Sequence, residues 1–400
     1  MTRVLYVAPY VPSPIRTRPW NVLRGLARRG YRVTVAALED GYATEADRRE
    51  LRAFCESVHV LPHPAWRGAL QAAAAMPSSR IPLSVAFCRS RALAATVRAL
   101  ATTSSFDVAH VEHLRAAPLV RELGGLPAVF DAVDCLTDLF RQRHREREGG
   151  PLRTWISGLE ATRLSAYEPA ACRAFAHVAV TTGAEAACLL SLAPGLGVAV
   201  VPNGVDAEYF RPRDDAAPED YTLVFSGKLS YFANEDAARY LLEEILPRLR
   251  ERVPEARVIL AGARPSRALR AIAARAGGVR VTGYVSDLRP VLSCACAAVC
   301  PVRVAVGVQN KVLEAMAMGL PVVATPLAAR GALADAPGAA LRVAADADGL
   351  ARACAEVLTA PAAARAEAGA AARSFVRARA GWERAVEGFA DLYASAMRRK

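Results

Sequence analysis

The residues best suited to chemistry gather in one stretch, positions 303–325, which reads RVAVGVQNKVLEAMAMGLPVVAT. Gly307 to Lys311 form a polar loop, and the run at 312–318 has helical character. A polar loop that opens a helix presents unpaired backbone N–H groups and the positive end of the helix dipole to an anion. Lys311 adds a full charge there, and Glu314 lies one turn further along. A phosphate at the helix start and a hydroxyl on Glu314 would describe a sugar nucleotide. The alternative is an ordinary helix start in which Glu314 favours the dipole.

The segment NKVLEAMAMGLPVVAT resembles the donor-binding segment of GT-B glycosyltransferases of family 4. The resemblance implies that Glu314 binds the ribose of the donor nucleotide. It also implies that Lys311 and the loop before it hold the diphosphate, the loop residues being Gly307, Val308, Gln309 and Asn310.

The family usually has a second glutamate eight positions before the first, where this chain has Val306. The GVQNK form resembles a subgroup that lacks that glutamate, including sugar transferases linked to exopolysaccharide and exosortase systems. Val306 in place of this glutamate affects the expected contact with the donor sugar, and it leaves the expected nucleotide contact unchanged.

Three further segments of the second half match the family pattern. Gly227-Lys228-Leu229 stands where the family has Gly-Arg-Leu, so the resemblance implies that Lys228 contacts the donor diphosphate. Asn234 occupies the position of a second basic contact, so one charge is missing. The loop after Gly283 would lie against the nucleobase. The remaining expected donor contacts are Gly262, Tyr284 and Val285.

In the first half, a predicted strand at Arg3–Ala8 is followed by the loop PYVPSPIRTRPW, which carries Arg16 and Arg18. Open α/β sheets bind ligands at the carboxyl ends of their strands, so these guanidinium groups are candidate contacts for phosphate or acceptor. The alternative is a proline-stiffened surface loop with solvated arginines. The loop lacks GxGxxG, which excludes a Rossmann oxidoreductase.

The segment DVAHVEH at 107–113, in which a strand is predicted at Asp107–Val111, resembles the strand end of the family that carries a cleft histidine. His110 falls inside the strand and is interpreted as a packed core residue. His113 falls just past it and is the candidate catalytic histidine, able to bond the donor sugar or share the proton of the acceptor. Asp134, after the next strand, is a candidate to orient it or to bind acceptor hydroxyls. The alternative is that both histidines merely pack.

Strands alternate with helical segments along the chain, which predicts an α/β fold. Gly319 after the helical run and Pro321 soon after it predict a helix end there. The resemblance implies a GT-B fold, with two doubly wound Rossmann-like domains facing across a cleft. The predicted domains are 1–202 on the acceptor side and 203–380 on the donor side, and a C-terminal helix within 381–400 crosses back to complete the first.

Composition indicates a globular protein, with 53% apolar and 22% charged residues among 400. The net charge of +12 suits an anionic ligand or an acidic membrane surface better than nucleic acid. The basic run FRQRHRERE at 140–148 is a solvated helix face or a contact for anionic lipid. Nine scattered cysteines, without a CxxC pair in the cluster Cys294, Cys296 and Cys300, predict reduced thiols rather than a metal site.

The implied reaction is retaining transfer of a sugar from a nucleoside diphosphate sugar to an acceptor hydroxyl, in cell-surface polysaccharide or glycolipid synthesis. Lys228 and Lys311 would stabilise the leaving diphosphate, so no cofactor and no metal is expected. The expected partners are the nucleotide sugar, a lipid-linked or glycan acceptor and an anionic membrane surface touched peripherally, but no nucleic acid. The absence of a signal peptide predicts a cytoplasmic location, with the inner membrane face as an option. The alternatives are a GT-B sugar-nucleotide epimerase and a catalytically weak sugar-nucleotide-binding protein.

Overall fold

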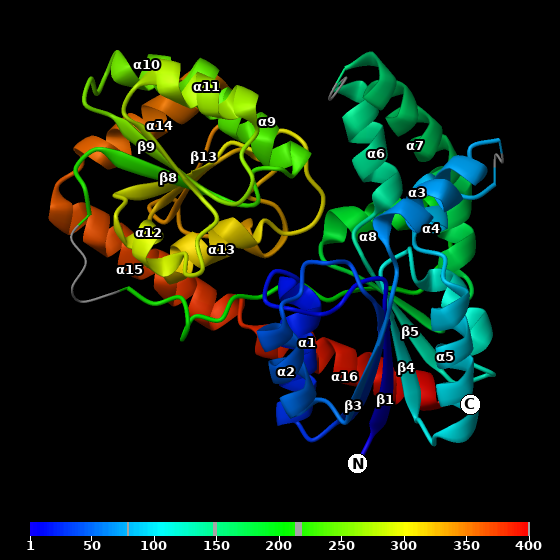
Figure 1. Ribbon diagram of the computed structural model, residues 1–400. Helices are drawn as coiled ribbons and strands as arrows, with labels where there is room; N and C mark the ends of the chain where they lie inside the picture. The colour runs from blue at the N-terminus through cyan, green and yellow to red at the C-terminus, as the bar shows by residue number, and fades with distance from the viewer. Residues whose placement is uncertain (78–79, 147–149, 213–217, 399–400) are drawn as a thin grey trace. The chain divides into compact units, whose positions relative to one another are not determined.

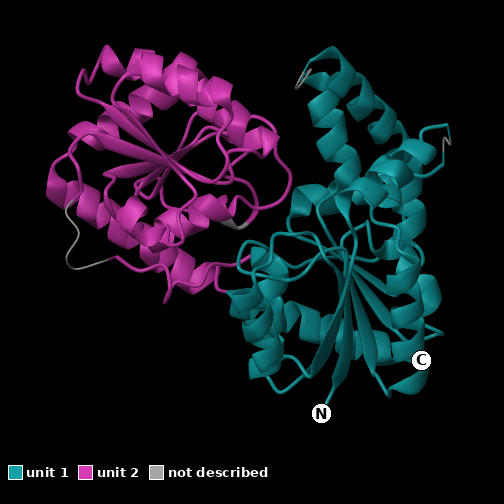
Figure 2. Ribbon diagram, viewed as in Figure 1, with its two compact units in different colours: residues 1–202, 382–400 teal, residues 203–381 magenta. Residues whose placement is uncertain are grey.

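The computed structural model describes residues 1–77, 80–146, 150–212 and 218–398, and the chain divides into two compact units. Unit 1 comprises Met1–Pro202 together with Trp382–Lys400, and unit 2 comprises Asn203–Gly381 (Figure 2). Each unit is an open parallel sheet with helices on both faces (Figure 1), which confirms the predicted α/β class with two doubly wound domains.

Unit 1 is built on a seven-stranded parallel sheet of order β3-β2-β1-β4-β5-β6-β7. Its central strands are continuous apolar runs because helices bury both faces, and β1 is buried from Val4 to Ala8. The strands are β1 (Arg3–Ala8), β2 (Arg32–Leu38), β3 (Ser57–Leu61), β4 (Val108–Glu112), β5 (Ala128–Val133), β6 (His177–Val180) and β7 (Val198–Val200).

The helices of unit 1 include the last helix of the chain, which packs against α1 near Gly25, beside the side chain of Val386. The predicted return of the C-terminal helix to the first domain is therefore confirmed. The helices are α1 (Thr17–Arg28), α2 (Glu45–Phe54), α3 (Ala65–Ala74), α4 (Leu83–Phe87), α5 (Arg91–Thr103), the 3-10 helix η1 (Ala117–Glu122), α6 (Leu136–Arg145), α7 (Pro151–Cys172), α8 (Gly183–Leu192) and α16 (Trp382–Arg398).

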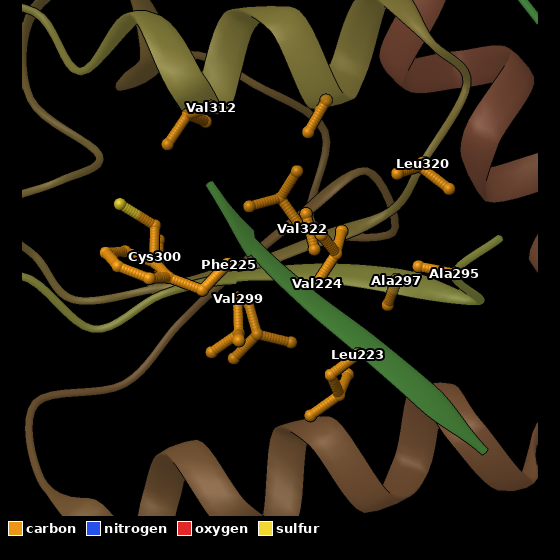
Figure 3. Close-up of a cluster of buried hydrophobic side chains, with 14 of the residues drawn as sticks. Leu223, Val224, Phe225, Ala295, Ala297, Val299, Cys300, Val312, Leu320 and Val322 are labelled. Atoms are coloured by element: carbon orange, nitrogen blue, oxygen red, sulfur yellow. The ribbon is translucent and has the colours of Figure 1, made fainter. Parts of the chain in front are cut away.

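Unit 2 is built on a six-stranded parallel sheet of order β10-β9-β8-β11-β12-β13. Apolar side chains of the central strands pack under the helices, among them Phe225, Val299 and Val322 (Figure 3). The strands are β8 (Thr222–Ser226), β9 (Arg257–Ala261), β10 (Val279–Gly283), β11 (Ala297–Cys300), β12 (Val322–Ala324) and β13 (Leu341–Val343).

The helices of unit 2 begin with α9 (Phe232–Tyr240), which runs through a π-helical turn, η2 (Leu241–Ile245), into α10 (Leu246–Arg250). The others are α11 (Arg267–Ala276), α12 (Arg289–Ser293), α13 (Asn310–Ala317), the 3-10 helix η3 (Gly331–Leu333), α14 (Ala347–Thr359) and α15 (Ala362–Arg379).

Helix α13 ends where the sequence predicts. Gly319 adopts a positive φ of 72°, and its N–H bonds the carbonyl of Met316. The N–H of Leu320 reaches back to the carbonyl of Ala315, which completes a glycine-based helix end. Pro321 then leads directly into β12, so the chain turns from the site helix into the core within four residues.

Helix α1 begins earlier than the sequence suggests. The structure starts it at Thr17, so Arg18 and Pro19 belong to its first turn and not to the loop. A proline is tolerated there because the first N–H groups of a helix have no partner within the helix. Within the described ranges, no helix is long and apolar enough to cross a bilayer.

Candidate functional site

The side chain of Lys311 is fixed at the start of helix α13. Its Nζ donates hydrogen bonds to Asn234 Oδ1 at 2.8 Å and to Gln309 Oε1 at 3.0 Å. It also lies 5.6 Å from the centroid of the Phe225 ring at the end of β8. Both hydrogen-bond acceptors are neutral amides, so the ammonium group is oriented without being neutralised. A cation in this state at a helix N-terminus attracts an anion strongly.

Asn234 therefore has a role that the family comparison did not suggest. The resemblance implies a second basic contact with the donor at this position. Asn234 instead orients the basic residue that is present, Lys311. Its amide Oδ1 accepts from Lys311 while its Nδ2 donates to the backbone carbonyl of Lys228 at 3.1 Å. One amide thus ties the two predicted lysine segments together.

Two glycines bring the loops after β8 and β9 into close contact. A Cβ atom added to Gly262 would lie 1.7 Å from the carbonyl oxygen of Gly227. A Cβ atom added to Gly227 would lie 2.8 Å from Asn234 Nδ2 and 3.2 Å from Lys311 Cε. Any larger residue would displace the loops, so both glycines are needed to form this edge of the sheet. The structure brings Gly227, Asn234, Gly262 and Lys311 together as one cluster.

Glu314 lies one turn beyond Lys311 on the same helix and is half-buried. Burial raises the pKa of its carboxyl to about 7, and Lys311 offsets part of that rise. Among the described residues no donor bonds this carboxylate. A half-buried carboxylate without a partner is costly unless a ligand supplies one, which suits a hydroxyl-bearing ligand.

The other donor candidates of unit 2 differ in their surroundings. Gly307 has a positive φ of 71°, and the side chain of Val308 packs into the core, leaving only its backbone for a ligand. Asn310 Oδ1 accepts from Asn203 Nδ2 at 3.2 Å. Tyr284 is 76% exposed and Val285 half-buried, both just past β10, so the structure does not join them to Lys311.

Arg18 requires a correction. The sequence places it on a ligand-facing loop, but it is 5% exposed in the first turn of α1. Its Nε and Nη2 bond the two carboxylate oxygens of Asp131 at 2.7 and 2.9 Å, and Nη1 bonds the carbonyl of Val201 at 2.9 Å. A buried bidentate ion pair of this kind holds α1 onto the sheet. Arg18 is therefore a structural residue and not a phosphate contact.

Arg16 keeps a position at the carboxyl edge of the unit 1 sheet. Its side chain is 33% exposed, pairs with Asp40 at 2.8 Å and lies over the ring of Tyr10 at 4.3 Å. A role for Arg16 in ligand binding stays a prediction.

His110 lies within β4 and His113 just past its end, as the sequence suggests. His110 is fully buried, stacks on Tyr6 at 4.3 Å and meets the hydroxyl of Tyr393 at 2.7 Å through Nδ1. His113 follows the strand with a positive φ of 67°, and its Nδ1 accepts the N–H of Arg115 at 3.3 Å. Burial, with the nearby guanidinium groups, lowers the pKa of His113. The ring is therefore neutral, with its proton on Nε2.

Asp134 follows β5, the neighbour of β4, after a β-bulge at Asp131 and Val133. Burial raises the pKa of its carboxyl, and the charge of Glu185 adds to the effect. No hydrogen bond or ion pair within the described residues joins Asp134 to His113, so its part in orienting that histidine stays a prediction.

Glu112 is a candidate that the sequence reasoning missed. It is the last residue of β4, next to His113, and it is fully buried. The hydroxyls of Tyr6 and Tyr10 donate to its carboxylate at 2.8 and 2.7 Å. Burial, with the charge of Asp131, raises its pKa to about 7. The available signal was an acidic residue inside an otherwise apolar strand, since such residues are rarely buried without a purpose.

Metal ligands do not gather in the described part of the chain, where no group of three or more His, Cys, Asp or Glu side chains could hold an ion. The cluster Cys294, Cys296 and Cys300 consists of free thiols beside and within β11.

Residues 220–360 match the model of the family described as Glycosyl transferases group 1. The matched residues make up most of unit 2. The match includes the cluster around Lys311 and Glu314, in agreement with the expected resemblance of this segment to group 1 glycosyl transferases. No curated protein matches the whole sequence significantly.

Solved glycosyltransferase structures share the fold of the whole chain. Sucrose-phosphate synthase from Thermosynechococcus elongatus has 16% identity and a TM-score of 0.72, with 100% of both chains covered. HepE of Anabaena, solved with UDP and glucose, has 14% identity and a TM-score of 0.69, with 99% of this chain and 100% of that one covered. A UDP-forming trehalose-phosphate synthase from Burkholderia vietnamiensis has 14% identity and a TM-score of 0.65, with full coverage of both. At these identities the likeness establishes the GT-B fold.

The raised pKa of Glu112 predicts a specific pH dependence of stability. Its folded value of about 7 exceeds its ordinary value of 4.5, so the folded state binds the proton more tightly. Stability should therefore fall as pH rises between those two values. Glu112→Gln removes this contribution, so the stability of the variant relative to the parent should rise by roughly 1–3 kcal/mol between pH 5 and pH 8. Chemical denaturation at both pH values measures the free energy of unfolding of each protein. A difference between variant and parent that is the same at pH 5 and pH 8 would contradict the prediction.

Proposed function

We propose that the protein is a retaining glycosyltransferase that moves a sugar from a nucleoside diphosphate sugar to an acceptor hydroxyl. The observation that carries the proposal is the ammonium group of Lys311, held by two neutral amides at the start of α13, with the partnerless carboxylate of Glu314 one turn away. This pair matches a diphosphate next to a ribose. Retention of configuration and a place in cell-surface polysaccharide or glycolipid synthesis follow from the family resemblance.

In this proposal the chain itself stabilises the leaving group. The diphosphate gains negative charge as the glycosidic bond to the donor breaks. Lys311, Lys228 and the N–H groups at the start of α13 provide fixed positive charge where it develops, without reorganising. We expect transfer to proceed without a metal, and so to persist in the presence of EDTA.

Two other functions would use the same cluster. A sugar-nucleotide epimerase would isomerise the donor sugar in the absence of any acceptor. A sugar-nucleotide-binding protein would bind the donor and release no product, and Val306 in place of the usual glutamate favours this option. Product analysis with and without acceptor separates the three.

Replacing Glu314 tests the ribose contact. The parent is first screened by thermal shift against UDP-, GDP-, ADP- and dTDP-sugars to select the base. Glu314→Ala should then weaken binding of that nucleoside diphosphate roughly 10- to 100-fold, the scale of a lost charged hydrogen bond. His113→Ala is the contrasting variant, because it should lower turnover while leaving nucleotide affinity unchanged. Equal affinity of Glu314→Ala and the parent, measured by calorimetry, would refute the assignment.

We further propose that unit 1 meets an anionic membrane surface from the cytoplasm. Large apolar side chains are exposed on two of its helices, namely Trp66 and Leu70 of α3 and Leu152 and Trp155 of α7, each more than half exposed. Basic residues end α6, which packs against α7 (Figure 1). Residues 147–148 of the predicted basic run lie outside the described residues. Exposed aromatic rings beside basic side chains suit the boundary of an anionic bilayer.

Vesicle flotation tests the membrane contact. The protein should float with vesicles that contain phosphatidylglycerol and remain unbound with purely zwitterionic ones, because the attraction is electrostatic as well as apolar. Trp66→Ala combined with Trp155→Ala should reduce recovery several-fold. The matched control is Leu190→Ala, which truncates an exposed apolar residue of α8 in the same unit. Equal recovery with both vesicle types would rule the proposal out.

A further inference from the structure

A cavity of unit 1 lies at the carboxyl edge of its sheet. It has a volume of about 600 Å³, and its wall includes Pro9 after β1, Leu38 at the end of β2 and Arg115 after β4. These three strands are neighbours in the sheet, and ligands of open α/β sheets bind at this edge. We propose that the cavity binds the acceptor through a phosphate or diphosphate group attached to an apolar chain. This inference rests on the proposed function insofar as it names the ligand an acceptor.

Positive charge lines the cavity without compensation. Arg89, Arg91, Arg115 and Arg121 contribute to its wall. None of the four guanidinium groups forms an ion pair with a carboxylate of the described residues. The one acidic residue of the wall, Glu122, is already paired with Arg98. Arginines converging on one cavity without acidic partners form the arrangement that recognises phosphate.

Buried polar atoms of the wall also lack partners. Arg115 Nε and Gln71 Oε1 are shielded from solvent, and neither has a hydrogen-bond partner within the described chain. Both residues face the same cavity. Such atoms cost stability unless a ligand or ordered water satisfies them. Arg115 and Gln71 thus add polar groups to this part of the wall.

Much of the remaining wall is apolar, and it continues into a second cavity of about 290 Å³. The two cavities share Ile81, Arg89, Pro118 and Arg121, so the two arginines stand where the cavities meet. Beyond them the second cavity is lined largely by alanine, with Ala170, Ala171 and Ala174 near the end of α7. A charged group at the arginines would leave an attached hydrocarbon chain lying along these small apolar residues.

Buried charges of α7 fix the helices that form this wall. Glu160 is 1% exposed and accepts the N–H groups of Leu83 and Ser84 at the start of α4, at 2.7 and 2.8 Å. Arg163 is 4% exposed and donates to the carbonyls of Ala75 and Ile81 at 3.1 and 3.2 Å. These two buried charged side chains hold α3 and α4 in place, so the cavity is preformed.

The cavity also adjoins the candidate catalytic histidine. Arg115 lines the cavity, and its backbone N–H holds His113 Nδ1 at 3.3 Å. An acceptor anchored by its phosphate would therefore present its hydroxyl groups near that ring. Together, the charge, the apolar extension and this proximity single out an amphiphilic anion as the acceptor.

Calorimetric binding of geranyl diphosphate to the full chain tests the proposal, with inorganic pyrophosphate, geraniol and a hexose phosphate as comparison ligands. Geranyl diphosphate should bind at least tenfold more tightly than any of the three, because it alone has both features. The double variant Arg89→Gln with Arg121→Gln should weaken it at least tenfold, the scale of a lost charge-assisted hydrogen bond. Ala170→Trp, at an exposed position of the second cavity, should weaken geranyl diphosphate and leave pyrophosphate unchanged.

The matched control is Arg52→Gln, which removes an equally charged, half-exposed side chain of α2 away from the cavity. It should leave affinity for geranyl diphosphate unchanged. Nucleoside diphosphate affinity should be the same in all variants, which shows that they are folded. Failure of geranyl diphosphate to bind, or affinity equal to that of pyrophosphate or hexose phosphate, would overturn the proposal. Binding of geranyl diphosphate by a protein that binds no nucleotide would retain this site and refute the proposed function instead.

Discussion

The role of each cationic side chain depends on whether a neighbouring carboxylate neutralises its charge. Lys311 is oriented by the amide oxygens of Asn234 and Gln309, which fix its position and leave its charge intact. Arg18 is bound by the carboxylate of Asp131 and is almost fully buried. The first arrangement keeps an attraction for an anionic ligand, whereas the second uses its charge within the fold. The same distinction separates the arginines of the unit 1 cavity from those paired on the surface.

Close packing of the backbone makes the first arrangement possible. Gly227 and Gly262 let the loops after β8 and β9 approach within a distance that no other residue permits. That approach places Asn234 beside both lysine segments, and the glycine end of α13 at Gly319 fixes the helix from its other side. The site is thus held by backbone geometry, with few side chains left to adjust, which suits preorganised stabilisation of a leaving group.

Much of this could be predicted from the sequence because the signals are local. A stretch of a few residues is enough to predict the apolar strands, the helix end at Gly319 and the charge at Lys311. Arg18 was misplaced because Pro19 suggested a loop, although a proline fits the first turn of a helix. Glu112 was missed because its tyrosine partners come from β1 and the loop after it, about a hundred residues away. The cavity of unit 1 brings Arg89, between α4 and α5, together with Arg121 of η1, and no local pattern reveals that.

The most direct test of the central claim compares the affinity of a nucleoside diphosphate with that of the corresponding monophosphate, in the parent and in Lys311→Met. The base is the one that the thermal-shift screen selects. The parent should prefer the diphosphate by about tenfold or more, since one charge-assisted hydrogen bond contributes roughly 1.5–3 kcal/mol. Lys311→Met should bind both nucleotides with similar affinity. A preference for the diphosphate that survives the substitution would contradict the account.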